Sequence, residues 1–188
     1  MGLEPKHVRD LLRRHGHVKG QDVQDWKGSF PLHDSVVAFY RDVGPLDVTI
    51  RGYGNPFFLP MLARLWDYQA GYRWDGLTGT PVSDWSIDWV VVADDGSGAF
   101  IFSRRSGRVS YSLHGAGRWQ PTELFPDIHT MAACLATLGT VVEEAGKSLT
   151  DDDGVIKAEL LETARQLLSD ILGSAEQANL VLITAGWM

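Results

Sequence analysis

Residues 85–114 read WSIDWVVVADDGSGAFIFSRRSGRVSYSLH and constrain the fold more than any other stretch of the chain. Apolar and polar side chains alternate along much of it, and two polar segments that end in glycine, 94–98 and 104–107, interrupt it. Alternation with a period of two is typical of a strand with one buried face, and glycine supplies the positive φ of a tight reversal. The stretch therefore predicts three antiparallel strands, with Phe100 and Phe102 on one face of the middle strand.

Helical periodicity flanks this predicted sheet on both sides. Apolar residues recur every three or four positions in five segments, which are 4–15, 34–43, 60–71, 131–146 and a stretch that begins after the aspartates 151–153 and ends before Gly173. Two further segments are predicted as strands, the alternating residues 46–51 and the short apolar run 179–184. Helices before and after a central antiparallel sheet are typical of an α+β fold, here with a C-terminal helix plus a short strand.

The chain is long enough to bury a large core. It has 188 residues, 44% of them hydrophobic, and seven tryptophans. We expect an N-terminal helix and connection over residues 1–27 and an α+β domain over 28–148. A C-terminal helix and strand over 149–188 are expected to pack on that domain.

The net charge of −7 is unevenly spread along the chain. Residues 1–28 carry a net charge of +2 and residues 29–188 a net charge of −9. An acidic body is unsuited to nucleic acid, which requires clustered Lys and Arg, and it favours a basic partner. The single cysteine, Cys134, excludes an internal disulfide, and no apolar run reaches the ~18 residues of a membrane span. We therefore expect a cytoplasmic protein without nucleic-acid or membrane partners.

No residue pattern in the chain indicates chemistry. His15 and His17 lack an evident third metal ligand, and Cys134 lies in an apolar helical pattern typical of a core position. Nucleophile elbows, zinc-protease helices and dinucleotide-binding glycine motifs are all missing from the sequence. We therefore expect no enzyme activity, no cofactor and no metal, with an unrecognised hydrolase as the least favoured alternative.

Aromatic residues interleaved with acidic ones are the strongest functional signal. They occur in Trp66-Asp67-Tyr68, in Tyr72-Arg73-Trp74-Asp75 and in Asp84-Trp85-Ser86-Ile87-Asp88-Trp89. Trp and Tyr are frequent anchors of protein interfaces, and acidic groups speed the capture of a basic partner, although such aromatics also close hydrophobic cores. The partner-binding candidates are Trp74, Asp84, Trp85, Asp88, Asp94, Asp95 and Trp119.

Short motifs between about residues 28 and 146 resemble the SUKH superfamily, which includes bacterial toxin-immunity proteins and fungal cell-wall regulators. FPLHDSVVAFYRDVGP at 30–45 is similar to its opening element and WVVVADDGSG at 89–98 to its central hairpin. GRVSY at 107–111 with His114 resembles the next strand, and residues 131–138 resemble the closing helix.

The resemblance implies an antiparallel α+β fold without catalysis. It further implies an immunity protein that neutralises a bacterial toxin or effector in the cytoplasm by direct binding. The alternative is a regulatory scaffold of the same fold that acts through protein–protein contacts. We expect a monomer or a weak homodimer.

Overall fold

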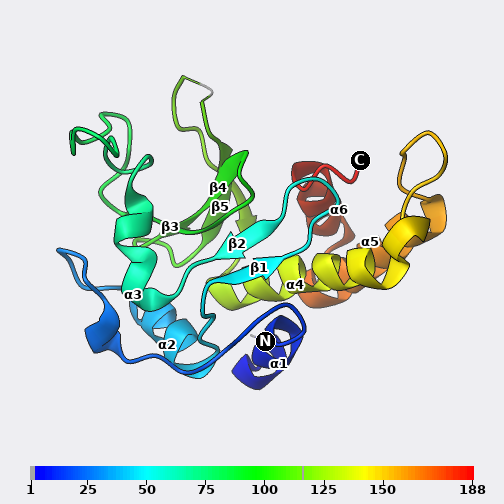
Figure 1. The fold of residues 1–188 in the computed structure, drawn as a ribbon, viewed down its shortest axis with the longest axis horizontal. Coiled ribbons are helices and arrows are strands. Elements are labelled where there is room, and N and C mark those ends of the chain that lie inside the picture. The colour runs from blue at the N-terminus through cyan, green and yellow to red at the C-terminus, as the bar shows by residue number, and fades with distance from the viewer. Residues whose placement is uncertain (1–2, 116) are drawn as a thin grey trace.

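The computed structural model describes residues 3–115 and 117–188, which form one sheet and a layer of helices (Figure 1). The strands are β1 (Val48–Ile50), β2 (Phe57–Leu59), β3 (Trp89–Asp94), β4 (Gly98–Ser103), β5 (Val109–Leu113) and β6 (Thr122–Phe125). The helices are α1 (Pro5–Leu12), α2 (Asp34–Asp42), α3 (Leu62–Leu65), α4 (Ile128–Ala145), α5 (Ala158–Leu172) and α6 (Ala175–Thr184).

The sheet of the described residues is a six-stranded antiparallel meander in the order β1-β2-β3-β4-β5-β6. Every strand therefore pairs with its neighbours in sequence, and the longest connection, residues 60–88 between β2 and β3, contains α3. The α+β fold with a central antiparallel sheet flanked by helices is confirmed. The three central strands, β3 to β5, lie within the stretch 85–114, and Gly96 and Gly107 have positive φ values of 75° and 73° at the two turns.

The expectation of a half-buried sheet is wrong for its middle strand. Five of the six residues of β4 are buried, because both faces of this strand are covered. Phe100 and Phe102 belong to the main core beneath the helices, as predicted. Ala99 and Ile101 point to the opposite face and pack in a second, smaller apolar cluster. The strand consequently reads as a continuous apolar run.

Two strands and one helix differ from the sequence predictions. Residues 57–59 and 122–125 form the short strands β2 and β6, whose three or four residues are too few to show a period. The expected helix over residues 60–71 is limited to α3 and a 3-10 turn at Asp67–Gln69. The aspartates 151–153 form a turn before α5 and do not start the helix, because Asp151 Oδ1 accepts hydrogen bonds from the backbone N–H groups of residues 153 and 155.

The C-terminal segment 179–184 is helical, so the prediction of a short strand there is wrong. It forms the second half of α6, whose start is capped by Ser174 Oγ, which accepts a hydrogen bond from Gln177 N at 3.2 Å. Ala178, Val181 and Leu182 are buried at helical spacing. A short apolar run does not distinguish a strand from a buried helix turn, which is why its pattern misleads.

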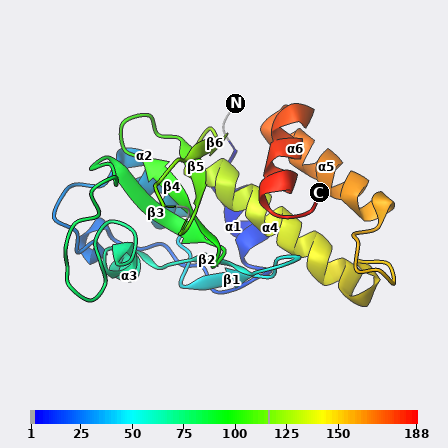
Figure 2. The same ribbon diagram turned by 90° about the horizontal axis from the view of Figure 1, so that it is seen from above.

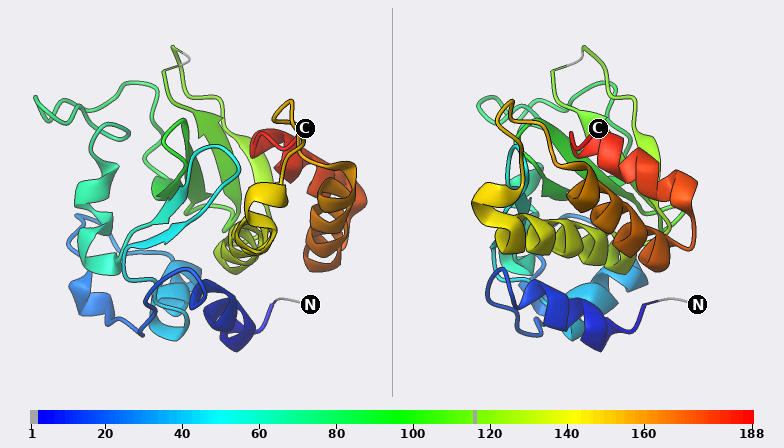
Figure 3. Two further views of the ribbon diagram at one scale, coloured as in Figure 1. Left: turned by 45° about the vertical axis from the view of Figure 1, so that its right-hand side comes forward. Right: turned by 90° about the vertical axis from the view of Figure 1, so that its right-hand side faces the viewer.

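Helix α4 forms the centre of the helical layer, with α1 below it and α5 beside it (Figures 2 and 3). Gly139 of α4 lies so close to β1 that a Cβ atom there would be 2.2 Å from Ile50 Cγ2. Val8 of α1 and Leu168 of α5 belong to the same core cluster as the sheet residues. Residues 1–27, 28–148 and 149–188 therefore all contribute to one core. Within residues 3–115 and 117–188, no helix is both long and apolar enough to span a bilayer.

Candidate functional site

The sheet face opposite α4 is covered by aromatic side chains. Trp85 is buried there against Val91, Ala99 and Ile101, and four aromatic residues that are partly exposed pack around this group. We call this surface the aromatic face, and it consists of Tyr68, Tyr72, Trp85, Trp89 and Trp119.

Edge-to-face contacts fix the geometry of the aromatic face. The ring of Trp85 lies 5.4 Å from that of Trp89 at 87° and 5.0 Å from that of Trp119 at 88°, measured between centroids. The ring centroid of Tyr72 lies 5.8 Å from that of Trp119, with the two rings tilted at 54°. Such pairs are favourable because the positive edge of one ring meets the negative face of the other. The outer rings are therefore held in fixed orientations on the sheet.

A long irregular segment, residues 66–88, supplies most of the aromatic face, and Gln69 anchors it. The buried amide of Gln69 donates from Nε2 to Leu65 O at 2.8 Å and to Val91 O at 3.0 Å. Its Oε1 accepts from Val91 N at 2.8 Å. The pairing of β2 with β3 is limited to Phe58 and Asp94, so Gln69 takes the place of a neighbouring strand at Val91.

Arg73 provides a second anchor for the same segment. Its Nη1 donates to Ile87 O at 3.2 Å and to Trp89 O at 3.1 Å. The guanidinium groups of Arg73 and Arg104 lie 4.8 and 4.1 Å from the ring centroid of Phe30. Burial, and then the nearby positive charge of Arg104, lower the pKa of Arg73. These contacts couple the aromatic segment to the start of β3 and to residue 30.

The structure brings two of the three predicted tryptophans together. Trp85 and Trp119 are in contact on the aromatic face, and the indole Nε1 of Trp85 is buried without a hydrogen-bond partner among the described residues. Trp74 is half-buried in a neighbouring group, where its ring lies 4.8 Å from that of Trp66.

Two of the four predicted aspartates lie in the β3–β4 turn. Asp95 is buried: its Oδ1 accepts from Ser97 N at 2.9 Å and from Gly98 N at 2.7 Å, and its Oδ2 accepts from the Tyr111 hydroxyl at 2.9 Å. Asp94 accepts from Gly96 N at 2.7 Å, and burial raises the pKa of its carboxyl. Asp95 is thus a structural group of the hairpin and is not available to a partner.

The other two aspartates lie beside the aromatic face. Asp84 is exposed, and its Oδ2 accepts a hydrogen bond from the backbone N–H of Trp119 at 2.7 Å. Asp88 is half-buried next to Trp89. The charge around this face is mixed, because Arg73 and Arg104 are close to Asp88. The acidic excess of the chain lies elsewhere, since residues 143–176 hold nine Asp or Glu against three Lys or Arg.

Sequence reasoning missed the exposed aliphatic residues of this segment. Ile87 is 72% exposed between Trp85 and Asp88, and Leu77 is fully exposed at the tip of the loop. No periodic pattern marks either residue, because both lie in irregular backbone. Exposed large aliphatic side chains next to aromatic ones form the kind of surface that a protein partner covers.

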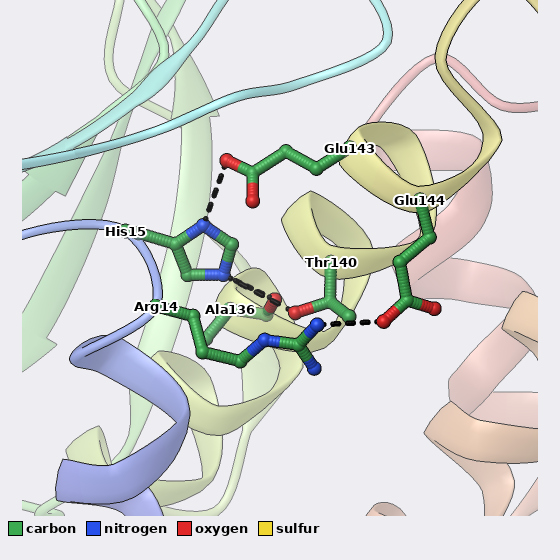
Figure 4. Close-up of polar contacts among 6 residues, drawn as sticks. All are labelled: Arg14, His15, Ala136, Thr140, Glu143 and Glu144. Carbon is green, nitrogen blue, oxygen red and sulfur yellow. Dashed lines mark hydrogen bonds and ion pairs between the residues drawn. The ribbon is translucent and has the colours of Figure 1, made fainter.

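The polar side chains of the α1–α4 contact serve packing. The buried ring of His15 has Nδ1 3.1 Å from Glu143 Oε1 and Nε2 2.9 Å from Ala136 O, and Thr140 Oγ1 is also within reach (Figure 4). His15 therefore links the residues that follow α1 to α4 through hydrogen bonds. His17 is exposed.

Two further findings concern reactive groups. Cys134 is buried in α4, and this burial raises the pKa of its thiol. Within residues 3–115 and 117–188, no three His, Cys, Asp or Glu side chains are grouped so as to hold a metal ion.

No protein-family model, curated protein or solved structure matches this chain. The resemblance to the SUKH superfamily therefore stays a prediction.

Proposed function

We propose that this chain is a non-catalytic binding domain that recognises another protein through the aromatic face. The observation that carries the proposal is the aromatic cover of the sheet face opposite α4, with partly exposed rings held in fixed orientations. Rigid Trp and Tyr side chains lose little conformational entropy on binding and are the commonest energetic anchors of interfaces.

The segment that carries the aromatic face supports the same conclusion. Residues 66–88 form a long connection with little regular structure, and such connections in compact domains are commonly functional. Gln69 and Arg73 hold its backbone in place, so a partner meets a preformed surface. The side chains of Ile87 and Leu77 in this segment are exposed to water in the free chain, and binding of a partner would remove their apolar area from solvent.

We further propose that the partner is a toxin or effector domain, which the chain neutralises by occlusion in a bacterial cytoplasm. This rests on the resemblance of residues 28–146 to the SUKH superfamily, a range that contains the whole aromatic face. Asp84 and Asp88 are the carboxylates placed to contact basic groups of such a partner. A regulatory scaffold of the same fold would use the same surface for a different partner.

The experiment is affinity capture from the cells that produce the chain, with matched variants. Tagged wild-type chain, Ile87→Glu and Ile183→Glu are compared by quantitative mass spectrometry. Ile183 is 54% exposed on α6 and does not belong to the aromatic face, and so controls for added charge. We expect one protein that wild type and Ile183→Glu retain equally and that Ile87→Glu loses. Equal retention by all three chains would contradict the proposal.

A further inference from the structure

Residues 73–82 form a narrow, hairpin-like loop, which we call the projecting loop. It extends from the molecule on the side of the sheet opposite α4 (Figures 1 and 2). Two backbone hydrogen bonds join its arms, from Val82 N to Arg73 O at 3.0 Å and from Asp75 N to Thr80 O at 2.8 Å. The two arms therefore support each other although neither is part of the sheet.

Both ends of the projecting loop are fixed on the aromatic face. Tyr72, which precedes the loop, belongs to that face, and Val82 at the end of the loop packs against the same apolar cluster. In the first arm, the ring of Trp74 lies 4.8 Å from that of Trp66. The projecting loop therefore rises from the aromatic face itself.

The carboxylate of Asp75 holds the tip of the projecting loop. Its Oδ1 accepts hydrogen bonds from Leu77 N at 3.0 Å, from Thr78 N at 2.7 Å and from Thr78 Oγ1 at 2.9 Å. The hydrogen bonds from Thr78, and then that from Leu77, lower the pKa of Asp75. Gly79 has a φ of 70° and closes the turn by donating from its N–H to Asp75 O at 2.8 Å. The backbone of the tip is therefore ordered in the free chain.

Leu77 is the apolar apex of this ordered tip. Its side chain is 99% exposed. Residues 76–83 contain no charged side chain, so the tip can leave water without the desolvation of a charge. Isolated apolar side chains are ordinary on protein surfaces, but this one stands on an ordered backbone that rises from an aromatic face. Burial of Leu77 in an apolar recess would be favourable.

We propose that the projecting loop is an insertion element, and that Leu77 enters an apolar recess of the partner protein while the aromatic face contacts the rim of that recess. This inference rests on the proposed function and adds the shape of the partner, which is a protein with a concave, uncharged pocket for an aliphatic side chain. A flat partner is disfavoured, because contact with the tip would hold it away from the rings. An ordered loop loses little conformational entropy on insertion.

The first experiment measures the affinity of purified variants for the protein that the wild-type chain captures and Ile87→Glu loses. Leu77→Met conserves apolar volume and should bind within about threefold of wild type. Leu77→Asp places a charge in the recess and should bind about tenfold more weakly or worse.

Three outcomes would overturn the insertion. Wild-type affinity of Leu77→Asp, or equal losses for Leu77→Met and Leu77→Asp, would do so and would leave the proposed function standing. If no captured protein is lost by Ile87→Glu, the proposed function and the insertion fail together.

Val155→Asp is the matched control for the added charge. Val155 is 60% exposed in a turn whose Asp151 Oδ1 accepts hydrogen bonds from the backbone N–H groups of residues 153 and 155. In Figure 1 this turn lies between α4 and α5, at the opposite end of the molecule from the projecting loop. Val155→Asp should bind like wild type, and a loss equal to that of Leu77→Asp would overturn the insertion.

The second experiment tests the order of the free tip and requires no partner. Asp75→Ala removes the acceptor of the backbone N–H groups of Leu77 and Thr78, whereas Asp75→Asn keeps an oxygen there. Hydrogen exchange followed by NMR should show both amides exchanging about tenfold faster in Asp75→Ala than in wild type, with Asp75→Asn close to wild type. Exchange that is equally fast in wild type and Asp75→Ala would contradict a preformed tip and overturn the proposal.

Discussion

Replacing Gln69 with Leu tests whether its amide holds the aromatic segment against the sheet. Leu is close to Gln in volume, so the change removes hydrogen bonds without opening a large cavity. It deletes the three hydrogen bonds to Leu65 O, Val91 O and Val91 N, and it leaves the two buried backbone groups of Val91 without partners. At about 1 kcal/mol for each net hydrogen bond, the free energy of unfolding should fall by about 3 kcal/mol.

Urea unfolding followed by tryptophan fluorescence measures this loss. With a denaturant slope of about 2 kcal/mol per molar, the midpoint should fall by about 1.5 M. Gln69→Glu is the matched comparison, because it keeps the shape and the acceptor for Val91 N but sets a second oxygen against two carbonyl oxygens, and it should also destabilise. A loss below about 1 kcal/mol for Gln69→Leu would refute the role given to this amide.

Three further substitutions test the packing and the titrating groups. Gly139→Ala should lower stability by about 1–3 kcal/mol in urea unfolding despite the better helix propensity of Ala, because the new Cβ would lie 2.2 Å from Ile50 Cγ2. Asp95→Ala should cost about 2–4 kcal/mol in the same assay, since it leaves the buried Gly98 N–H and the Tyr111 hydroxyl without their acceptor. Burial lowers the pKa of His129 in the folded chain, so the unfolded chain binds the proton more tightly. Stability is therefore lost as the pH falls below about 6.5, the ordinary pKa of histidine. His129→Phe should remove this part of the acid dependence of the melting temperature.

The central strands were predictable because local chemistry determines them. Residues 85–114 combine period-two alternation with two turns that contain Gly96 and Gly107, and the structure has β3, β4 and β5 on either side of these turns. Strands β2 and β6 have no such signal, since they exist through pairing with β1 and β5. Residues 179–184 have the composition of a strand, and the cap at Ser174 together with burial of one face makes them helical.

The candidate site was predictable in its residue types but less so in its geometry. The interleaved aromatics near Trp85 do gather on one sheet face, and Trp119 joins them from a distant part of the sequence. The Asp-Gly turn predicts the reversal at residues 94–98 but gives no information on whether the carboxylate of Asp95 points outward or inward. That direction is set by Tyr111 on β5, whose hydroxyl reaches the carboxylate across the sheet.

The affinity of the purified chain for its captured partner is the measurement that tests the central claim most directly. Isothermal titration calorimetry should show that Ile87→Glu and Trp119→Ala each weaken binding at least tenfold, which is about 1.4 kcal/mol, while Ile183→Glu binds like wild type. Equal affinities for the four chains would contradict the account, as would repeated turnover of a substrate by the purified protein.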